Sequence, residues 1–195
     1  MRRLAAVSVA MLLAPLAGRS ELVPCRRPAD GVRIAAALER IRRSVDPCGE
    51  SSDIVALLDR LGRCPRVRYE ICTDTHAARN VFEHADHVDE PGRIVWNPDL
   101  HSDLERGCAR DPTASLLHEI AHAVHDCEGL NAGAFEAEAV RIENVYRRAA
   151  GLCQRTRYGD EALPLASCDA GTCRCPGLVP APSGALGADA ADSAP

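Results

Sequence analysis

The strongest chemical signal in the sequence is a pair of histidines four residues apart, with a glutamate beside the first. The residues read His118-Glu119-Ile120-Ala121-His122 and match the H-E-x-x-H pattern. On a helix, such histidines lie about 40° apart around the axis and roughly 6 Å apart along it, so both can bind one tetrahedral zinc ion. We therefore predict a catalytic zinc site with His118 and His122 as ligands and Glu119 as the base that accepts a proton from water.

A hydrolytic zinc site needs a third protein ligand and an open fourth position. His125 lies on the same helix face but roughly 10 Å along the axis from His118, so we expect it at the rim of the site. The next predicted helix carries three glutamates, and of these Glu136 and Glu143 share a helix face, whereas Glu138 points away and is expected to be exposed. We predict Glu136 as the third ligand and Glu143 as a supporting carboxylate; Glu143 as the ligand is the open alternative.

Two helices must carry these residues. Asp111 followed by Pro112 marks the start of the first, whose apolar run continues to Gly129. Asn131 is the expected cap of the second, whose apolar stripe ends at Gly151. The face of the first helix opposite the histidines is expected to anchor it in the core and consists of Leu117, Ile120, Val124 and Cys127.

Two more helices are predicted upstream. The first follows Asp30 and stops at Asp46-Pro47, and the second runs from Ser51 or Ser52 to Gly62. The apolar stripe expected on the first of these helices is Val32, Ala35, Leu38, Ile41 and Val45.

Two strands are also predicted. Residues 66–73 alternate apolar and polar side chains, and residues 93–97 form a second apolar segment. Pro98 ends the second strand and favours an edge position for it. The stretch 77–89 is ambiguous between a helix and a loop.

The two ends of the chain differ from its middle. Residues 1–20 begin with Arg2 and Arg3 and continue with a short apolar run and small residues, which is typical of a secretory signal peptide. Residues 176–195 are rich in Pro, Ala and Gly and are expected to be disordered, which leaves 25–175 as the folded domain. All ten cysteines follow the signal, so we expect up to five disulfides and an extracellular or periplasmic location.

Composition excludes several classes of partner. The net charge is −5 and no basic run is dense enough to bind nucleic acid. The apolar run near the N-terminus is too short to span a membrane. We expect a monomer whose partner is a protein or peptide substrate, with zinc as the cofactor.

The segment 93–160 resembles the NleD-like effector zinc metallopeptidases and related bacterial toxin domains. The similarity lies in the run from Leu116 to His125, in Glu136-x-x-Ala139 and in the segment Arg155-Thr156-x-Tyr158. The resemblance implies an α+β, zincin-like fold, stapled here by disulfides: a small sheet with an edge strand above the active-site helix, and a second helix that bears a ligand. It also implies that residues 94–98 form that edge strand, and it supports Glu136 as the third ligand.

This site predicts a secreted zinc metallopeptidase that cleaves peptide bonds with zinc-activated water and Glu119 as general base. Tyr158 is the expected stabiliser of the oxyanion, with Arg155 and Arg147 as alternatives. The rival interpretation is a non-enzymatic, cysteine-rich secreted module whose zinc site is structural.

Overall fold

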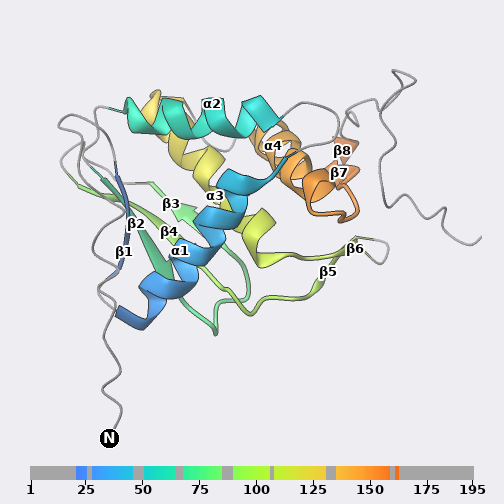
Figure 1. Ribbon diagram of the computed structural model, residues 1–195, viewed down its shortest axis with the longest axis horizontal. Coiled ribbons are helices and arrows are strands. Elements are labelled where there is room, and N and C mark those ends of the chain that lie inside the picture. Colours follow the sequence, from blue (N-terminus) through green and yellow to red (C-terminus); the bar gives the residue numbers. More distant parts are fainter. Residues whose placement is uncertain are drawn as a thin grey trace, which may run out of the picture.

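The computed structural model has an α+β fold, with four helices and a small mixed sheet among the residues that it describes (Figure 1). The predicted signal peptide and C-terminal tail lie outside the part of the chain that it describes. The described residues are 21–25, 28–45, 51–64, 68–84, 90–105, 108–130, 135–158 and 161–162.

The main sheet has the strand order β1-β2-β4-β3. β1, β2 and β4 run parallel, and β3 runs antiparallel to β4. β1 precedes residue 25, so the fold begins earlier than the predicted domain boundary. The strands are β1 (Glu21–Pro24), β2 (Arg68–Thr73), β3 (Val81–Glu83) and β4 (Gly92–Trp96).

The prediction of an edge position for the strand at 93–97 is wrong. This strand is β4, which pairs with β2 on one side and β3 on the other. Pro98 does not interrupt either ladder, because β4 ends at Trp96 and the missing N–H of the proline falls beyond it. The edge strand next to β4 is β3, in the segment that the sequence left ambiguous between a helix and a loop, and β1 lies at the opposite edge.

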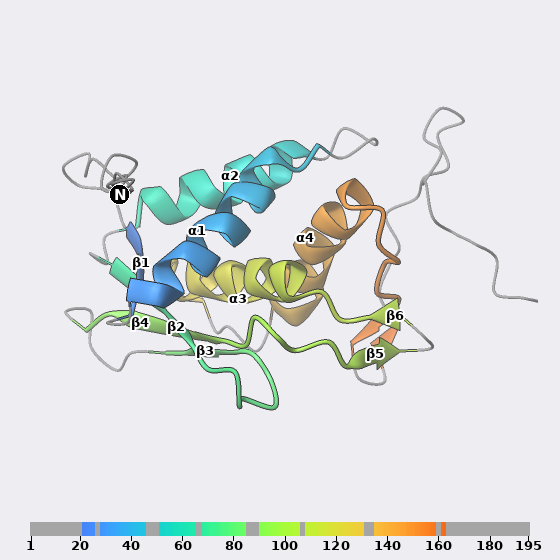
Figure 2. The same cartoon turned by 60° about the horizontal axis from the view of Figure 1, so that its bottom comes forward.

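The four helices lie on one side of this sheet, with α3 in the middle of the molecule (Figure 2). α3 contacts β3 and β4 below it, α1 and α2 above it, and α4 beside it. The helices are α1 (Pro28–Arg43), α2 (Ser51–Gly62), α3 (Pro112–Cys127) and α4 (Glu136–Ala149). Short pairs complete the described elements: β5 (Asp103–Glu105) with β6 (Cys108–Ala109), and β7 (Arg157–Tyr158) with β8 (Glu161–Ala162).

The predicted anchoring face of α3 is confirmed. Leu117, Ile120 and Val124 are fully buried, and Cys127 forms a disulfide with Cys64 just beyond α2. At the other end of α3, the indole N–H of Trp96 donates to the carbonyl of Pro112 over 2.8 Å. Both ends of the helix are therefore fixed to neighbouring elements.

The ends of α3 and α4 follow local sequence signals. The Asp111 side chain accepts the backbone N–H of Ala114 at 2.8 Å and caps α3, as predicted. Gly129 and Gly151 have φ values of 71° and 69°, a region that favours glycine. At each helix end, the backbone N–H groups of the glycine and of the residue after it donate to carbonyls in the last turn of the helix, which is a Schellman motif. The chain can therefore turn sharply after α3 and fold back.

The apolar stripe predicted for α1 is correct only in part. Leu38 and Ile41 are buried, but Val32 and Val45 are 65% and 77% exposed. The buried face consists instead of Ile34, Ala37, Leu38 and Ile41. The predicted stop at residues 46–47 lies outside the described residues, and α1 itself ends at Arg43.

Disulfides hold the described part of the chain together, as expected from the cysteine count. Cys25 bridges Cys72 and joins β1 to β2, and Cys64 bridges Cys127. Cys153 is also disulfide-bonded. Among the described helices, none has both the length and the apolar character needed to cross a membrane.

We predict that Gly92→Ala destabilises the fold by about 1–3 kcal/mol, because it overpacks the core. Gly92 is the cross-strand partner of the fully buried Tyr69, and a Cβ at residue 92 would overlap the Tyr69 ring. Gly31→Ala is the matched control. Its Cβ would lie 3.6 Å from Pro24, an ordinary contact, and alanine favours the α1 helix by about 0.5–1 kcal/mol. Denaturant unfolding with intact disulfides measures both; equal free energies of unfolding for Gly92→Ala and the wild type would contradict this packing.

Candidate metal centre

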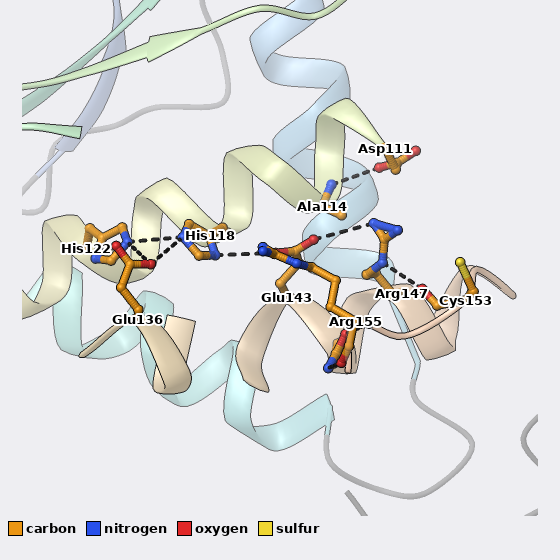
Figure 3. A network of polar contacts seen from close by, with 10 residues as sticks. Asp111, Ala114, His118, His122, Glu136, Glu143, Arg147, Cys153 and Arg155 are labelled. Atoms are coloured by element: carbon orange, nitrogen blue, oxygen red, sulfur yellow. Dashed lines mark hydrogen bonds and ion pairs between the residues drawn. The ribbon is translucent and has the colours of Figure 1, made fainter. Parts of the chain in front are cut away.

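Three side chains that the sequence nominated as ligands meet between α3 and α4 (Figure 3). Nε2 of His118 lies 3.1 Å from Nε2 of His122. Oε2 of Glu136 lies 3.2 Å from the first nitrogen and 3.3 Å from the second. The three donor atoms therefore form a nearly equilateral triangle that a single metal ion can share.

The size of this triangle matches tetrahedral coordination. With metal–ligand bonds of about 2.0–2.1 Å, the ligand atoms of a tetrahedron lie roughly 3.3–3.4 Å apart. The observed separations of 3.1–3.3 Å need only small adjustments. The imidazole side chains are 11% and 8% exposed, whereas the Glu136 side chain is 25% exposed, so the site is most open on the glutamate side.

The start of α4 places Glu136 at the site. Phe135 occupies the N-cap position of α4 and makes no side-chain capping hydrogen bond; the predicted cap, Asn131, lies outside the described residues. The Phe135 ring packs on the His125 ring at a centroid distance of 4.7 Å. The Nε2 atom of His125 lies 3.1 Å from a carboxylate oxygen of Glu138, which also holds the first turn of α4 against α3.

Two predictions about the surroundings of the site are therefore wrong. His125 is fully buried rather than at the rim, because it packs between α3 and the start of α4. Glu138 is not an unpaired surface carboxylate, since it pairs with His125 and also with Arg60 at 3.4 Å. The sequence does not reveal this pairing, because the turn between the helices decides which faces meet.

Glu143 lies behind the triangle rather than in it. Its Oε2 is 3.3 Å from Nδ1 of His118, the ring nitrogen that points away from Glu136. Such a carboxylate orients a histidine ligand and sets which nitrogen faces the metal. The geometry thus favours Glu136 as the ligand and Glu143 as its supporting group.

The site has a strongly negative character that suits a cation. Burial alone would lower the pKa of His118, but its contacts with Glu136 and Glu143 raise this pKa to about 9. Burial would likewise raise the pKa of Glu136, yet hydrogen bonds from the two histidines hold it well below its usual range. The raised pKa of His118 shows that the surrounding carboxylates stabilise a positive charge at this position, and the lowered pKa of Glu136 keeps that carboxylate ionised beside the histidines.

Glu119 lies next to this field but faces the sheet. It is largely buried, and burial raises its pKa while the charges of His118 and His122 act in the opposite direction. The backbone N–H of Phe82, on the edge strand β3, donates a hydrogen bond to its carboxylate. The interaction joins Glu119 to an element that the sequence did not identify as a strand.

The three candidates for oxyanion stabilisation differ in what the structure describes. Arg147 is fully buried and donates to the carbonyls of Cys153 and Ala109 at 2.7 Å each, so it cannot reach a substrate. Arg155 binds Glu143 at 3.0 Å. The side chain of Tyr158 lies outside the described part, and its role stays a prediction.

Cys25, Glu70 and Cys72 form a second group with closely spaced donor atoms. The two sulfur atoms are joined in a disulfide and offer no thiolate to a metal. The group also borders a cavity of about 760 Å³ in whose walls Arg68 and Arg93 offset the charges of Asp30 and Glu70. The histidine–glutamate triangle is therefore the better metal site.

Comparison of the chain with models of protein families, with curated proteins and with solved structures gives no match. The resemblance to metallopeptidases therefore stays a prediction from the motifs, and the chemistry of the site rests on its own geometry.

We predict that Glu136→Ala weakens zinc binding more than Glu143→Ala does. Loss of an outer carboxylate typically lowers metal affinity by about 10–100-fold, and loss of a ligand should exceed that range. Competition with a chromophoric chelator measures both affinities, and His122→Ala provides a variant that lacks one ligand nitrogen. A larger loss of zinc affinity in Glu143→Ala than in Glu136→Ala would make Glu143 the ligand.

Proposed function

We propose that this chain is a secreted zinc-dependent metallopeptidase with a zincin-like fold. The observation that carries the proposal is the convergence of two imidazole nitrogens and one carboxylate oxygen, within 3.1–3.3 Å of one another, from an H-E-x-x-H helix and the helix after it. Disulfides among the described residues and the signal-like N-terminal sequence support export.

Zinc is the metal that fits this donor set. Nitrogen ligands suit zinc far better than the hard cations calcium and magnesium, which prefer oxygen. When bound, zinc supplies Lewis acidity and an activated water molecule for hydrolysis. His118, His122 and Glu136 would hold it.

Glu119 is the proposed general base. It is covalently adjacent to one ligand and three residues before the other, and its carboxylate lies on the side of α3 that faces β3. A substrate between this strand and the metal site would thus lie beside the Glu119 carboxylate. Glu119 is held in place by its position on α3 and by the hydrogen bond from the Phe82 N–H. The proton taken up there can pass to the leaving amine.

The substrate is proposed to be an extended peptide. In the described chain β3 pairs only with β4, so its other edge has no strand partner. Backbone groups on such an edge can bind a peptide as an added strand. We therefore assign the role of the peptide-binding edge strand, expected for residues 94–98, to β3. This strand is antiparallel to β4 and contacts α3 directly.

The rival, a module with a structural zinc site, is less well supported. Structural zinc is almost always bound by four protein ligands, whereas catalytic zinc has three and an open position. Among the described residues, the group at this site contains three. The partial exposure of Glu136 also leaves a route for water.

We predict that Glu119→Gln retains zinc but loses at least about 100-fold in peptide hydrolysis, because an amide cannot accept the proton. Zinc content by elemental analysis and cleavage of a random peptide library measure the two effects. Glu39→Gln on the exposed side of α1 is the matched control and should keep full activity. Wild-type turnover by Glu119→Gln would remove this residue from the mechanism.

We also predict that cleavage of the peptide library requires the bound metal. A strong chelator should abolish cleavage, and added zinc should restore it, because the water is activated only at the metal. Cleavage by a protein shown to be metal-free would contradict the proposal. A zinc-loaded, folded protein that cleaves no peptide in the library would favour the structural-site rival.

A further inference from the structure

The side of His118 away from the other ligands is held by a buried charge network (Figure 3). Its centre is Glu143, whose side chain is 2% exposed and meets two arginines, Arg147 and Arg155. His118 contacts Glu136 at Nε2 and Glu143 at Nδ1, whereas the carboxylate contact of His122 is with Glu136 at Nε2. The supporting carboxylate therefore acts on His118 alone of the two imidazoles.

Arg155 acts on the same oxygen that faces the histidine. Its Nη1 donates to Oε2 of Glu143 at 3.0 Å, and this oxygen is 3.3 Å from Nδ1 of His118. Arg147 instead approaches Oε1 of Glu143, at 3.4 Å. One oxygen thus lies between Arg155 and His118, so the position of Arg155 bears directly on the imidazole.

The backbone of Arg155 is itself fixed to α4. Its N–H donates to the side-chain oxygen of Asn144 at 2.8 Å, and its carbonyl accepts from the amide nitrogen of the same residue at 2.9 Å. The carbonyl of Cys153 accepts from Arg147 at 2.7 Å. The segment 153–155 is thereby bound along the side of α4 that carries Glu143, and Arg155 has little freedom to leave the carboxylate.

We propose that Arg155 is a positioning residue of the metal centre. By holding Oε2 of Glu143 against Nδ1 of His118, it directs the Nε2 of this histidine toward His122 and Glu136. It also balances the charge of a buried carboxylate that a cation would otherwise attract. Without Arg155, Glu143 can rotate toward the ion and compete with Glu136. The inference rests on the metal centre of the proposed function but not on peptide hydrolysis.

The test compares Arg155→Gln and Arg155→Lys with the wild type in the full-length, oxidised protein. Zinc affinity is measured by competition with a chromophoric chelator, and the ligand geometry by the visible absorption spectrum of the cobalt(II)-loaded protein. We expect Arg155→Gln to lower zinc affinity by about 10–100-fold and to change the cobalt spectrum. Arg155→Lys keeps the positive charge and should restore part of the affinity.

Arg148→Gln is the matched control. Arg148 lies on α4, the helix that carries Glu143, and is buried, and its side chain donates to Gln154 at 3.1 Å. It should lose folding stability without a change in zinc affinity or in the cobalt spectrum. This variant separates a general loss of packing from an effect on the ligands.

The outcomes separate the two proposals. A wild-type protein that binds no zinc would overturn the metal centre itself, and the role of Arg155 with it. A wild type that binds zinc, together with a folded Arg155→Gln of equal affinity and spectrum, would overturn the role of Arg155 alone. Should Arg155→Gln fail to fold, Arg155→Lys decides: reduced affinity supports the role, and wild-type affinity with an unchanged spectrum contradicts it.

Discussion

The structure depends on the meeting of two imidazoles from α3 with one carboxylate from α4. These donors are brought within 3.1–3.3 Å because both helices are held firmly relative to each other. α3 is fixed by its buried apolar face, by the Trp96 hydrogen bond at its start and by the Cys64–Cys127 disulfide at its end. The turn at Gly129 and the contact of His125 with Glu138 then return the chain along α3.

Gathering these groups in the interior requires compensation. Three carboxylates, Glu119, Glu136 and Glu143, lie around two histidines, and an uncompensated buried charge is costly. Glu143 is balanced by Arg147 and Arg155, whereas Glu136 has the two histidines as its neighbours. A divalent cation at the triangle would balance Glu136 while leaving both imidazoles neutral, as metal ligands must be.

Local signals in the sequence were sufficient to predict the helices but not the way in which the helices and strands pack together. The cap at Asp111, the glycine at 129 and the H-E-x-x-H spacing predicted α3 and its histidines correctly, because each acts within a few residues. The edge position predicted from Pro98 was wrong and β3 was not identified, since pairing between distant segments is not a local property. The pairing of His125 with Glu138 and of Arg155 with Glu143 was missed for the same reason.

The most direct test of the central claim is X-ray absorption at the zinc edge of the zinc-loaded, oxidised protein. We expect one ion per chain with nitrogen and oxygen neighbours at about 2.0–2.2 Å and the multiple-scattering pattern of two imidazoles. Sulfur neighbours at about 2.3 Å would instead place the metal on cysteines. That result, or a failure to bind any zinc, would contradict a centre built from His118, His122 and Glu136.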